Sequence, residues 1–268
     1  MGLLNKEEML QHIDDPLMKQ QMVRLLDRAE GVLRNYEIKA TDFMTPYQIK
    51  LGMEILKGVD GIGALASGGY PGAERQVLVI YPDYYGEDQV SIPLRALEAR
   101  GNTQFNQVSH RDYLGSLLGL GIKREKVGDI LLHGEGNQHF CHMIVLEELK
   151  EYIQFNLEKV GRLSISLKEI SLEGIKPQEV HYQEGSATVA SLRLDAVISQ
   201  GFKISRADAQ TLVSRELITV NWEPIQRAAY HIAPGDIISV RGKGRLEILA
   251  IDGNTRSGRI RITYRKPK

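Results

Sequence analysis

The sequence predicts an α+β protein built in three parts along 268 residues. The first part is expected to be helical, because apolar residues from Leu10 to Leu26 recur at helical spacing. The middle part alternates short apolar strands with amphipathic helices, and the last part places two helices before several short strands. This pattern predicts a helical domain at 1–72, a middle α+β domain at 73–167, a connector at 168–187 and a C-terminal domain at 188–268.

The N-terminal part reads as helical over residues 5–57. The segment "TDFMTPYQIKLGMEIL" supplies a threonine cap and places Pro46 at an early helical position. A glycine-rich segment follows at residues 58–74, "GVDGIGALASGGYPGAE", and is expected to be a loop or hinge.

The middle part shows the order β-β-α-β-β-α-β, which predicts a sheet with helices on one face, of the ferredoxin or RRM type. The expected strands are 75–82, 89–99, 128–134, 138–145 and 162–170, and the expected helices are 111–121 and 146–160. An RRM that stacks bases carries a characteristic aromatic pattern on its sheet, and no such stretch occurs here. Phe140 is therefore expected in the core, and the domain is expected to fold like an RRM without stacking bases.

The C-terminal part changes in character and in charge. Residues 188–268 hold 14 Lys and Arg against 7 Asp and Glu, so they carry a net charge of +7 within a chain whose net charge is zero. This asymmetry indicates a polyanionic partner, either nucleic acid or an anionic membrane surface, and the alternative is a solvated basic face. Two helical patterns, 189–201 and 205–217, precede the strands, and Ser205 is a good N-cap for the second.

Composition narrows the class of protein further. Hydrophobic residues make up 42% of the chain and charged residues 25%, as in ordinary soluble proteins. No run of 18 apolar residues occurs, so no transmembrane helix is expected. Of the two polyanionic partners, nucleic acid is expected and a membrane is not. Cys141 is the single cysteine and is expected to be buried; its isolation is compatible with a reducing compartment, and the expected location is the cytoplasm.

Catalytic motifs are incomplete. "HRD" at residues 110–112 opens a protein-kinase catalytic loop, but the metal-binding Asn expected five residues after the Asp is Leu117. Asp112 is then expected to cap a helix. Alternatively, His110, Arg111, Lys123 and Arg124 form a second contact surface for RNA or ribosomal protein. No catalytic residue, metal site, cofactor or small-molecule substrate is expected.

The segment from Ser191 to Arg245 resembles an S4 RNA-binding domain. The family pattern is Arg-Leu-Asp, then Ser-Arg-x-x-Ala, Val-x-Val-Asn and Gly-Asp-x-Ile-x-Val. This chain supplies "RLD" at 193–195, "SRADA" at 205–209, "TVN" at 219–221 and "GDIISV" at 235–240. The resemblance implies two helices packed beside a small sheet, and RNA as the partner.

The whole chain is also similar to the YlmH family of S4-domain proteins. That similarity rests on two segments, "HRDYLGSLLGLGIKREKVGDI" at 110–130 and "SVRGKGR" at 239–245. The resemblance implies an RRM-like middle domain and binding to rRNA or tRNA. It further implies association with the large ribosomal subunit, in rescue of stalled subunits that still carry peptidyl-tRNA.

Physical chemistry favours RNA binding by the same segment. Helix starts expose backbone N–H groups and the positive end of a dipole, which attract phosphate. Residues 241, 243 and 245 alternate, so in an extended chain they share a face, and the intervening glycines permit close approach to phosphate. The expected RNA contacts are Arg193, Lys203, Ser205, Arg206, Arg215, Asn221, Arg241, Lys243 and Arg245. Asp195 is expected to brace its helix, because it would repel RNA.

Two other functions are open at this point. Some S4-bearing proteins are pseudouridine synthases, so an RNA-modifying enzyme is the first alternative. It needs acidic or nucleophilic residues gathered in a pocket of residues 1–165. An adaptor role in cell division is the second alternative, and it would require a protein partner rather than the RNA-binding face.

Overall fold

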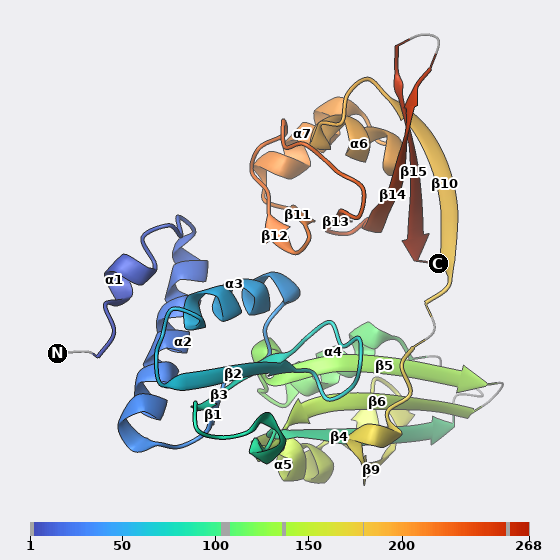
Figure 1. The fold of residues 1–268 in the computed structure, drawn as a ribbon. Helices are drawn as coiled ribbons and strands as arrows, with labels where there is room; N and C mark the ends of the chain where they lie inside the picture. The colour runs from blue at the N-terminus through green and yellow to red at the C-terminus, as the bar shows by residue number, and fades with distance from the viewer. Residues whose placement is uncertain (1–2, 103–107, 136–137, 179, 256–257, 268) are drawn as a thin grey trace. The chain divides into compact units, whose positions relative to one another are not determined.

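The computed structural model describes residues 3–102, 108–135, 138–178, 180–255 and 258–267. The chain divides after Gln178 into two compact units, and each is considered by itself (Figure 1). The first unit contains the helical and middle parts of the sequence. The second unit contains the S4-like part.

The first unit begins with three helices whose starts follow from the sequence. They are α1 (Lys6–Met9), α2 (Pro16–Asn35) and α3 (Pro46–Leu56). The Asp15 carboxylate caps α2 by accepting from the N–H groups of Leu17 and Met18 at 2.8 and 3.0 Å. Thr45 and Gln48 form a capping box at the start of α3, which confirms the predicted threonine cap before Pro46.

A three-stranded antiparallel sheet packs against these helices in the order β1-β3-β2. Its strands are β1 (Lys39–Ala40), β2 (Ile62–Ser67) and β3 (Val77–Pro82). The expectation of a loop over all of residues 58–74 is therefore wrong, because β2 lies inside that segment. Gly63 pairs with Tyr81, and a Cβ at Gly63 would lie 2.4 Å from the Tyr81 ring. This glycine permits close packing across the sheet rather than a turn.

A second, four-stranded sheet follows, with the antiparallel order β5-β6-β4-β9. In chain order its elements alternate as βαββαβ, the ferredoxin-like arrangement that was predicted. They are β4 (Leu94–Asn102), α4 (His110–Gly119), β5 (Val127–Glu135), β6 (Gln138–Leu146), α5 (Lys150–Asn156) and β9 (Ser166–Ile170), with a small hairpin of β7 (Lys159–Val160) and β8 (Leu163–Ser164) before β9.

Strand β3 is buried on both faces and joins the two sheets into one core. Leu78 and Ile80 pack with α2 and α3, whereas Val77 and Val79 pack with residues of the four-stranded sheet, among them Ala96. The unit therefore stacks helices, sheet, sheet and helices. The predicted strand at 75–82 belongs to the first sheet, so the region from 73 onward does not form one sheet. The predicted domain boundaries themselves stay a prediction.

The face of the four-stranded sheet that an RRM uses for RNA is largely covered by this packing. Leu94, Ala96 and Ile144 are fully buried there, in the same cluster as Val77 and Val79. Phe140 lies farther along that face and is only half-buried, so its expected core position is wrong. Its ring stacks on His133 at 4.7 Å between centroids.

The second unit carries helices on one face of a six-stranded antiparallel sheet, as predicted (Figure 1). The sheet order is β10-β15-β14-β13-β11-β12, and Leu194, Val213 and Leu246 are among the residues of its core. The elements are β10 (Tyr182–Val189), α6 (Leu194–Gly201), α7 (Arg206–Ser214), β11 (Ile218–Val220), β12 (Glu223–Pro224), β13 (Ile237–Val240), β14 (Gly244–Asn254) and β15 (Ile260–Pro267).

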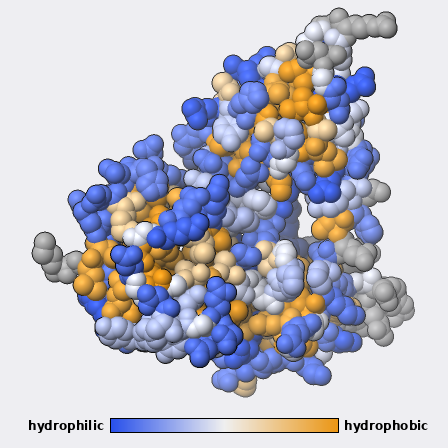
Figure 2. Space-filling view, in the orientation of Figure 1, coloured by the Kyte–Doolittle hydropathy of each residue, from blue (hydrophilic) through white to orange (hydrophobic). Residues whose placement is uncertain are grey.

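The surface is predominantly hydrophilic in the view of Figure 2, with hydrophobic residues visible between polar ones. Within the described part of the chain, no helix has both the length and the apolar character needed to cross a membrane.

Candidate nucleic-acid interface

A buried carboxylate organises the starts of both helices in the second unit. Asp195 lies in the first turn of α6 and is completely buried. It accepts hydrogen bonds from Arg193 Nε at 3.2 Å, Arg206 Nε at 3.1 Å and Gln210 Nε2 at 2.9 Å. Burial by itself would raise the pKa of Asp195, but the bonds from Gln210, Arg206 and Arg193 lower it to about 2. Asp195 therefore stays ionised and braces the helices, as expected.

The two arginines are fixed by this carboxylate yet remain accessible. The Arg193 side chain is 43% exposed and that of Arg206 is 50% exposed. Arg193 is the N-cap of α6, and Arg206 is the first residue of α7. A cation at a helix start is opposed by the helix dipole, so the buried carboxylate is what makes this placement favourable. The two exposed guanidinium groups add donors to helix ends that already favour anions.

Ser205 caps α7, as predicted, and its hydroxyl is already engaged. Its Oγ accepts from the Asp208 N–H at 3.0 Å and donates to the Asp208 carboxylate at 2.7 Å. Ser205 therefore sets the position of Arg206. A direct contact of Ser205 with RNA stays a prediction.

Lys203 lies between the helices, with a left-handed backbone at φ 54°. It is exposed, and it lies close enough to Lys266 to lower that residue's pKa, together with the larger effect of burial. The Lys266 ammonium donates to the Gly201 carbonyl at the end of α6 and lies 4.8 Å from the centroid of the Phe202 ring. Lys266 was not among the expected contacts, because it lies outside the motifs and only the charge count includes it.

The "RGKGR" segment is a hairpin turn, so the expectation of an extended strand with three aligned cations is wrong. Val240 pairs with Gly244, and the Lys243 N–H donates to the Val240 carbonyl at 2.9 Å. Gly242 and Gly244 have φ values of 80° and 101°, which explains why glycine occupies both positions. Arg241 and Lys243 are exposed in the turn.

Arg245 does not lie in the turn with Arg241 and Lys243, because it belongs to β14. It pairs with Ser239, and its Nε donates to the Ser239 hydroxyl at 3.3 Å. Its neighbour Leu246 is fully buried in the core beneath α6 and α7. Successive residues of a strand face opposite ways, so Arg245 lies on the sheet face away from the helices.

Arg215 and Asn221 complete the predicted set. Arg215 is the exposed C-cap of α7, near the turn because the Arg241 N–H donates to the Leu217 carbonyl at 2.9 Å. The Asn221 side chain donates to Asp236 Oδ1 at 2.8 Å and accepts from the Ile237 N–H at 2.9 Å. Asn221 thus joins two strand ends within the unit, and its role toward RNA stays a prediction.

The four residues of the possible second surface differ in what they do. Ser109 and Asp112 pair at the start of α4, since the Ser109 N–H and hydroxyl each donate to the carboxylate at 2.7 Å. This helix begins at His110, one residue before the expected start at residue 111. Arg124 donates to the carbonyl groups of Val127 and Gly128, and burial lowers its pKa.

His110 is coupled to that arginine. Burial lowers the pKa of His110, and the nearby charge of Arg124 lowers it further. Arg111 and Lys123 are exposed. Arg124 is therefore used to hold the start of β5, while His110, Arg111 and Lys123 are exposed residues. A second contact surface here stays a prediction.

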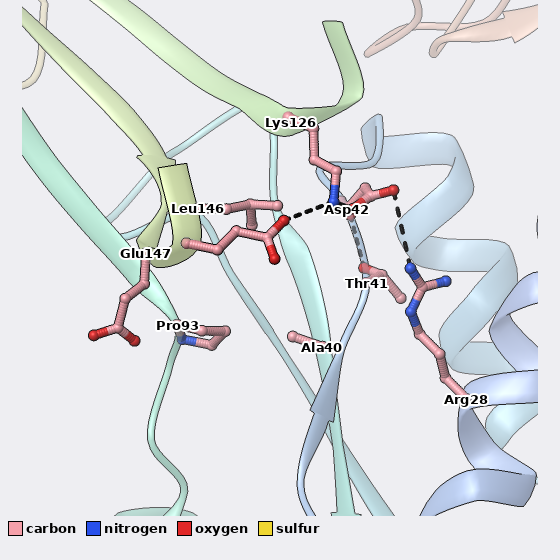
Figure 3. A pocket seen from close by; sticks show the side chains of 9 residues that line it. Arg28, Ala40, Thr41, Asp42, Pro93, Lys126, Leu146 and Glu147 are labelled. Atoms are coloured by element: carbon pink, nitrogen blue, oxygen red, sulfur yellow. Dashed lines mark hydrogen bonds and ion pairs between the residues drawn. The ribbon is translucent and has the colours of Figure 1, made fainter. Parts of the chain in front are cut away.

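A pocket of about 390 Å³ lies in the first unit (Figure 3). Four of its charged residues form ion pairs with one another: Lys126 lies 2.9 Å from Asp42 and 2.8 Å from Glu148, and Arg28 lies 3.9 Å from Asp42. The fifth, Glu147, pairs with Arg95 outside the pocket. Burial lowers the pKa of Lys126, but its bonds to Glu148 and Asp42 outweigh this and raise it. Lys126 therefore stays charged and unsuited to act as a base. Asp42 and Glu148 are thus both paired with the charged Lys126 in this pocket.

Paired helix starts bearing exposed arginines on a small sheet define a nucleic-acid-binding module of the S4 type. Residues 192–238 match the family model of the S4 domain. Residues 18–85 match the model of the YlmH N-terminal region, and residues 89–174 match a model described as a putative RNA-binding domain in YlmH.

A relative that covers most of the chain agrees with these models. The chain is 34% identical over 237 residues to ribosome-associated protein quality control protein P2 of Bacillus subtilis, covering 88% of this chain and 90% of the relative. The chain therefore belongs to the YlmH family. Small ribosomal subunit protein uS4 of Coxiella burnetii (strain CbuK_Q154) is 46% identical over 59 residues, 21% of this chain and 29% of that protein. A solved structure, cell division protein ylmH from Streptococcus pneumoniae, matches with a TM-score of 0.49 and 25% identity, over 61% of this chain and 96% of that one.

Proposed function

We propose that this protein is a non-enzymatic factor that binds structured RNA through its S4 domain. The observation that carries the proposal is the pair of half-exposed arginines, Arg193 and Arg206, held at two helix starts by one buried carboxylate. Arginine forks held in fixed positions suit phosphate oxygens, and little side-chain entropy is lost when they bind.

The second support is the position of the other cations. Arg206 begins α7, while Arg215 ends it beside the turn that carries Arg241 and Lys243. A helix of nine residues holds the Cα atoms of Arg206 and Arg215 roughly 13 Å apart. Phosphates of a folded RNA are likewise fixed in space, so two cationic residues on one rigid helix favour structured RNA over a flexible strand.

The ribosomal step of the proposal is drawn from the family. The Bacillus relative is named as ribosome-associated and as acting in protein quality control. We infer that this chain binds rRNA or tRNA on the large ribosomal subunit, in rescue of subunits that still carry peptidyl-tRNA, and works in the cytoplasm. The ion-paired pocket of the first unit favours this binding role over an RNA-modifying enzyme.

Co-sedimentation of the full-length protein with purified small and large subunits, with and without peptidyl-tRNA, tests the proposal across a salt series. The expected result is preferential binding to large subunits that carry peptidyl-tRNA, weakening steeply as salt rises. Binding to neither subunit would overturn the ribosomal part. Free tRNA and a folded rRNA fragment, measured in parallel, then show whether RNA binding itself remains.

Loss of both cations from the turn should weaken RNA binding without affecting folding. Arg241→Ala with Lys243→Ala removes two exposed side chains, so we expect the free energy of unfolding to change by less than about 0.5 kcal/mol. Affinity for folded RNA at low salt should fall roughly tenfold, and the logarithmic salt slope should drop by about 1.4 to 1.8. Denaturant titration and a filter-binding series provide the two measurements. Unchanged affinity would remove this turn from the interface.

A further inference from the structure

Trp222 occupies a backbone position that disfavours it. Asn221 and Trp222 form the two-residue turn between β11 and β12, since Val220 pairs with Glu223. Their φ values are 51° and 65°. Hairpin turns of this kind prefer Asn followed by Gly, because a large side chain is strained at positive φ. The bonds of Asn221 to Asp236 and Ile237 explain the first residue, but turn geometry gives no reason for a tryptophan at the second.

The Trp222 ring lies with Arg245 on the sheet face away from α6 and α7. The Arg245 guanidinium carbon is 5.0 Å from the centroid of the ring, within the range of a cation–π contact. Trp222 is only half-buried, so it is not a core residue of the sheet. Its indole is therefore an aromatic surface held by a strained turn beside a cation.

A second aromatic and cation pair lies across the same face. Glu247, two residues beyond Arg245 on β14, accepts from Arg265 Nε at 2.7 Å and from Arg265 Nη2 at 3.0 Å. The Arg265 guanidinium in turn lies 4.2 Å from the centroid of the Tyr182 ring on β10, and that tyrosine is 41% exposed. The face thus presents aromatic, arginine, glutamate, arginine and aromatic groups in a row, and Glu184 lies beside Arg265 as its cross-strand partner.

We propose that this row, which we call the stacking face (Trp222, Arg245, Glu247, Arg265 and Tyr182), binds an unpaired segment of RNA. Aromatic rings stack on bases of any identity, and neighbouring arginines contact the backbone phosphates or stack in turn. Trp222 is the principal stacking residue, a role that explains a tryptophan in a strained turn. The proposal rests on the proposed function, because it takes RNA as the ligand of the S4 domain.

This surface is distinct from the one at the helix starts. Leu246, between Arg245 and Glu247, is buried in the core shared with α6 and α7, so the stacking face lies on the opposite side of the sheet. Arg245, Arg265 and Tyr182 also lie outside residues 192–238, the part that matches the S4 family model. The inference therefore adds an RNA contact of a different kind: stacking on single-stranded bases rather than phosphate binding by helix ends.

The chain contains one tryptophan, so the emission excited selectively from tryptophan reports on this face alone. Titration of the full-length protein with oligoadenylate of eight nucleotides is expected to quench that emission to saturation. Trp222→Phe keeps an aromatic ring and should bind labelled oligoadenylate within threefold of the wild type. Trp222→Gly suits the turn, so it should fold, yet its affinity should fall at least fivefold, the scale of one lost stacking contact.

Two further measurements separate this inference from the proposed function. Arg206→Ala should lose affinity for folded RNA while its fluorescence is still quenched by oligoadenylate. Two outcomes would overturn the stacking face alone. In the first, the wild type binds folded RNA but oligoadenylate does not quench its emission. In the second, Trp222→Gly binds oligoadenylate as tightly as the wild type does. Quenching by an acidic peptide but not by RNA would assign the face to a protein partner and also overturn it. Failure of the wild type to bind any RNA would overturn the proposed function.

Discussion

Replacing Asp195 with asparagine is expected to destabilise the S4 domain by about 2 to 4 kcal/mol, because two guanidinium groups lose their buried partner. Asn has nearly the same shape, but its amide carries no charge and cannot accept from both arginines as the carboxylate does. Denaturant unfolding followed by Trp222 fluorescence measures the change, since that tryptophan lies in the same domain.

Asp208→Asn is the matched control, because Asp208 pairs with Ser205 on the surface of the same helix pair. This substitution should lower the free energy of unfolding by about 1 kcal/mol or less, the usual effect of losing a helix cap. Equal losses in the two variants would contradict the account of Asp195 as the buried anchor.

The same carboxylate predicts a dependence of stability on pH. The pKa of Asp195 is lowered from its ordinary value of 3.8 to about 2 in the folded protein. A group with a depressed pKa stabilises the fold above its ordinary pKa, and this contribution is lost as pH falls toward the folded value. The wild type should therefore lose about 2 kcal/mol between pH 4 and pH 2 through this group. The stability of Asp195→Asn should not show this loss between pH 4 and pH 2.

The largest effect of a single substitution on RNA binding is expected from Arg206→Ala. Arg193 and Gln210 still hold Asp195 in this variant, so the fold should persist with a loss of about 1 to 2 kcal/mol. Affinity for folded RNA should fall about tenfold, the scale of one charge-assisted contact. Arg206→Lys keeps the charge but lacks the forked guanidinium, so its affinity for folded RNA should lie between those of the wild type and Arg206→Ala.

Arg162→Ala provides the control for charge. Arg162 is an exposed arginine in the turn between β7 and β8 of the first unit, so its loss changes net charge by the same amount at a distant part of the sequence. We expect its affinity for folded RNA to stay within twofold of the wild type. A loss equal to that of Arg206→Ala would indicate general attraction by net charge rather than a site.

The fold could be predicted wherever the chain carried a clear local pattern. The capped start of α3 and the βαββαβ order of the four-stranded sheet followed from caps and alternation. Strand β2 was missed because Gly61 and Gly63 suggest a loop, whereas Gly63 makes room for the ring of Tyr81 across the sheet. Its partner β3 was predicted as a strand, but which sheet it joins depends on burial of both faces, a property of tertiary packing.

The candidate site was predictable to a similar extent. The S4 motif located Arg193, Arg206 and the cap at Ser205, and the repulsion of RNA by carboxylates indicated a bracing role for Asp195. The "RGKGR" turn was misread because alternation alone does not reveal the positive φ of Gly242 and Gly244. Trp222 was missed because its strain and its contact with Arg245 exist only once β11 and β14 are folded together.

The salt dependence of binding to folded RNA by the wild type and Arg206→Ala tests the central claim most directly. If Arg206 contacts phosphate, the logarithmic slope should decrease by about 0.7 to 0.9 in the variant, while Arg162→Ala keeps the wild-type slope. Equal slopes of log affinity against log salt for all three proteins would contradict the claim that the helix-start arginines form the RNA-binding site.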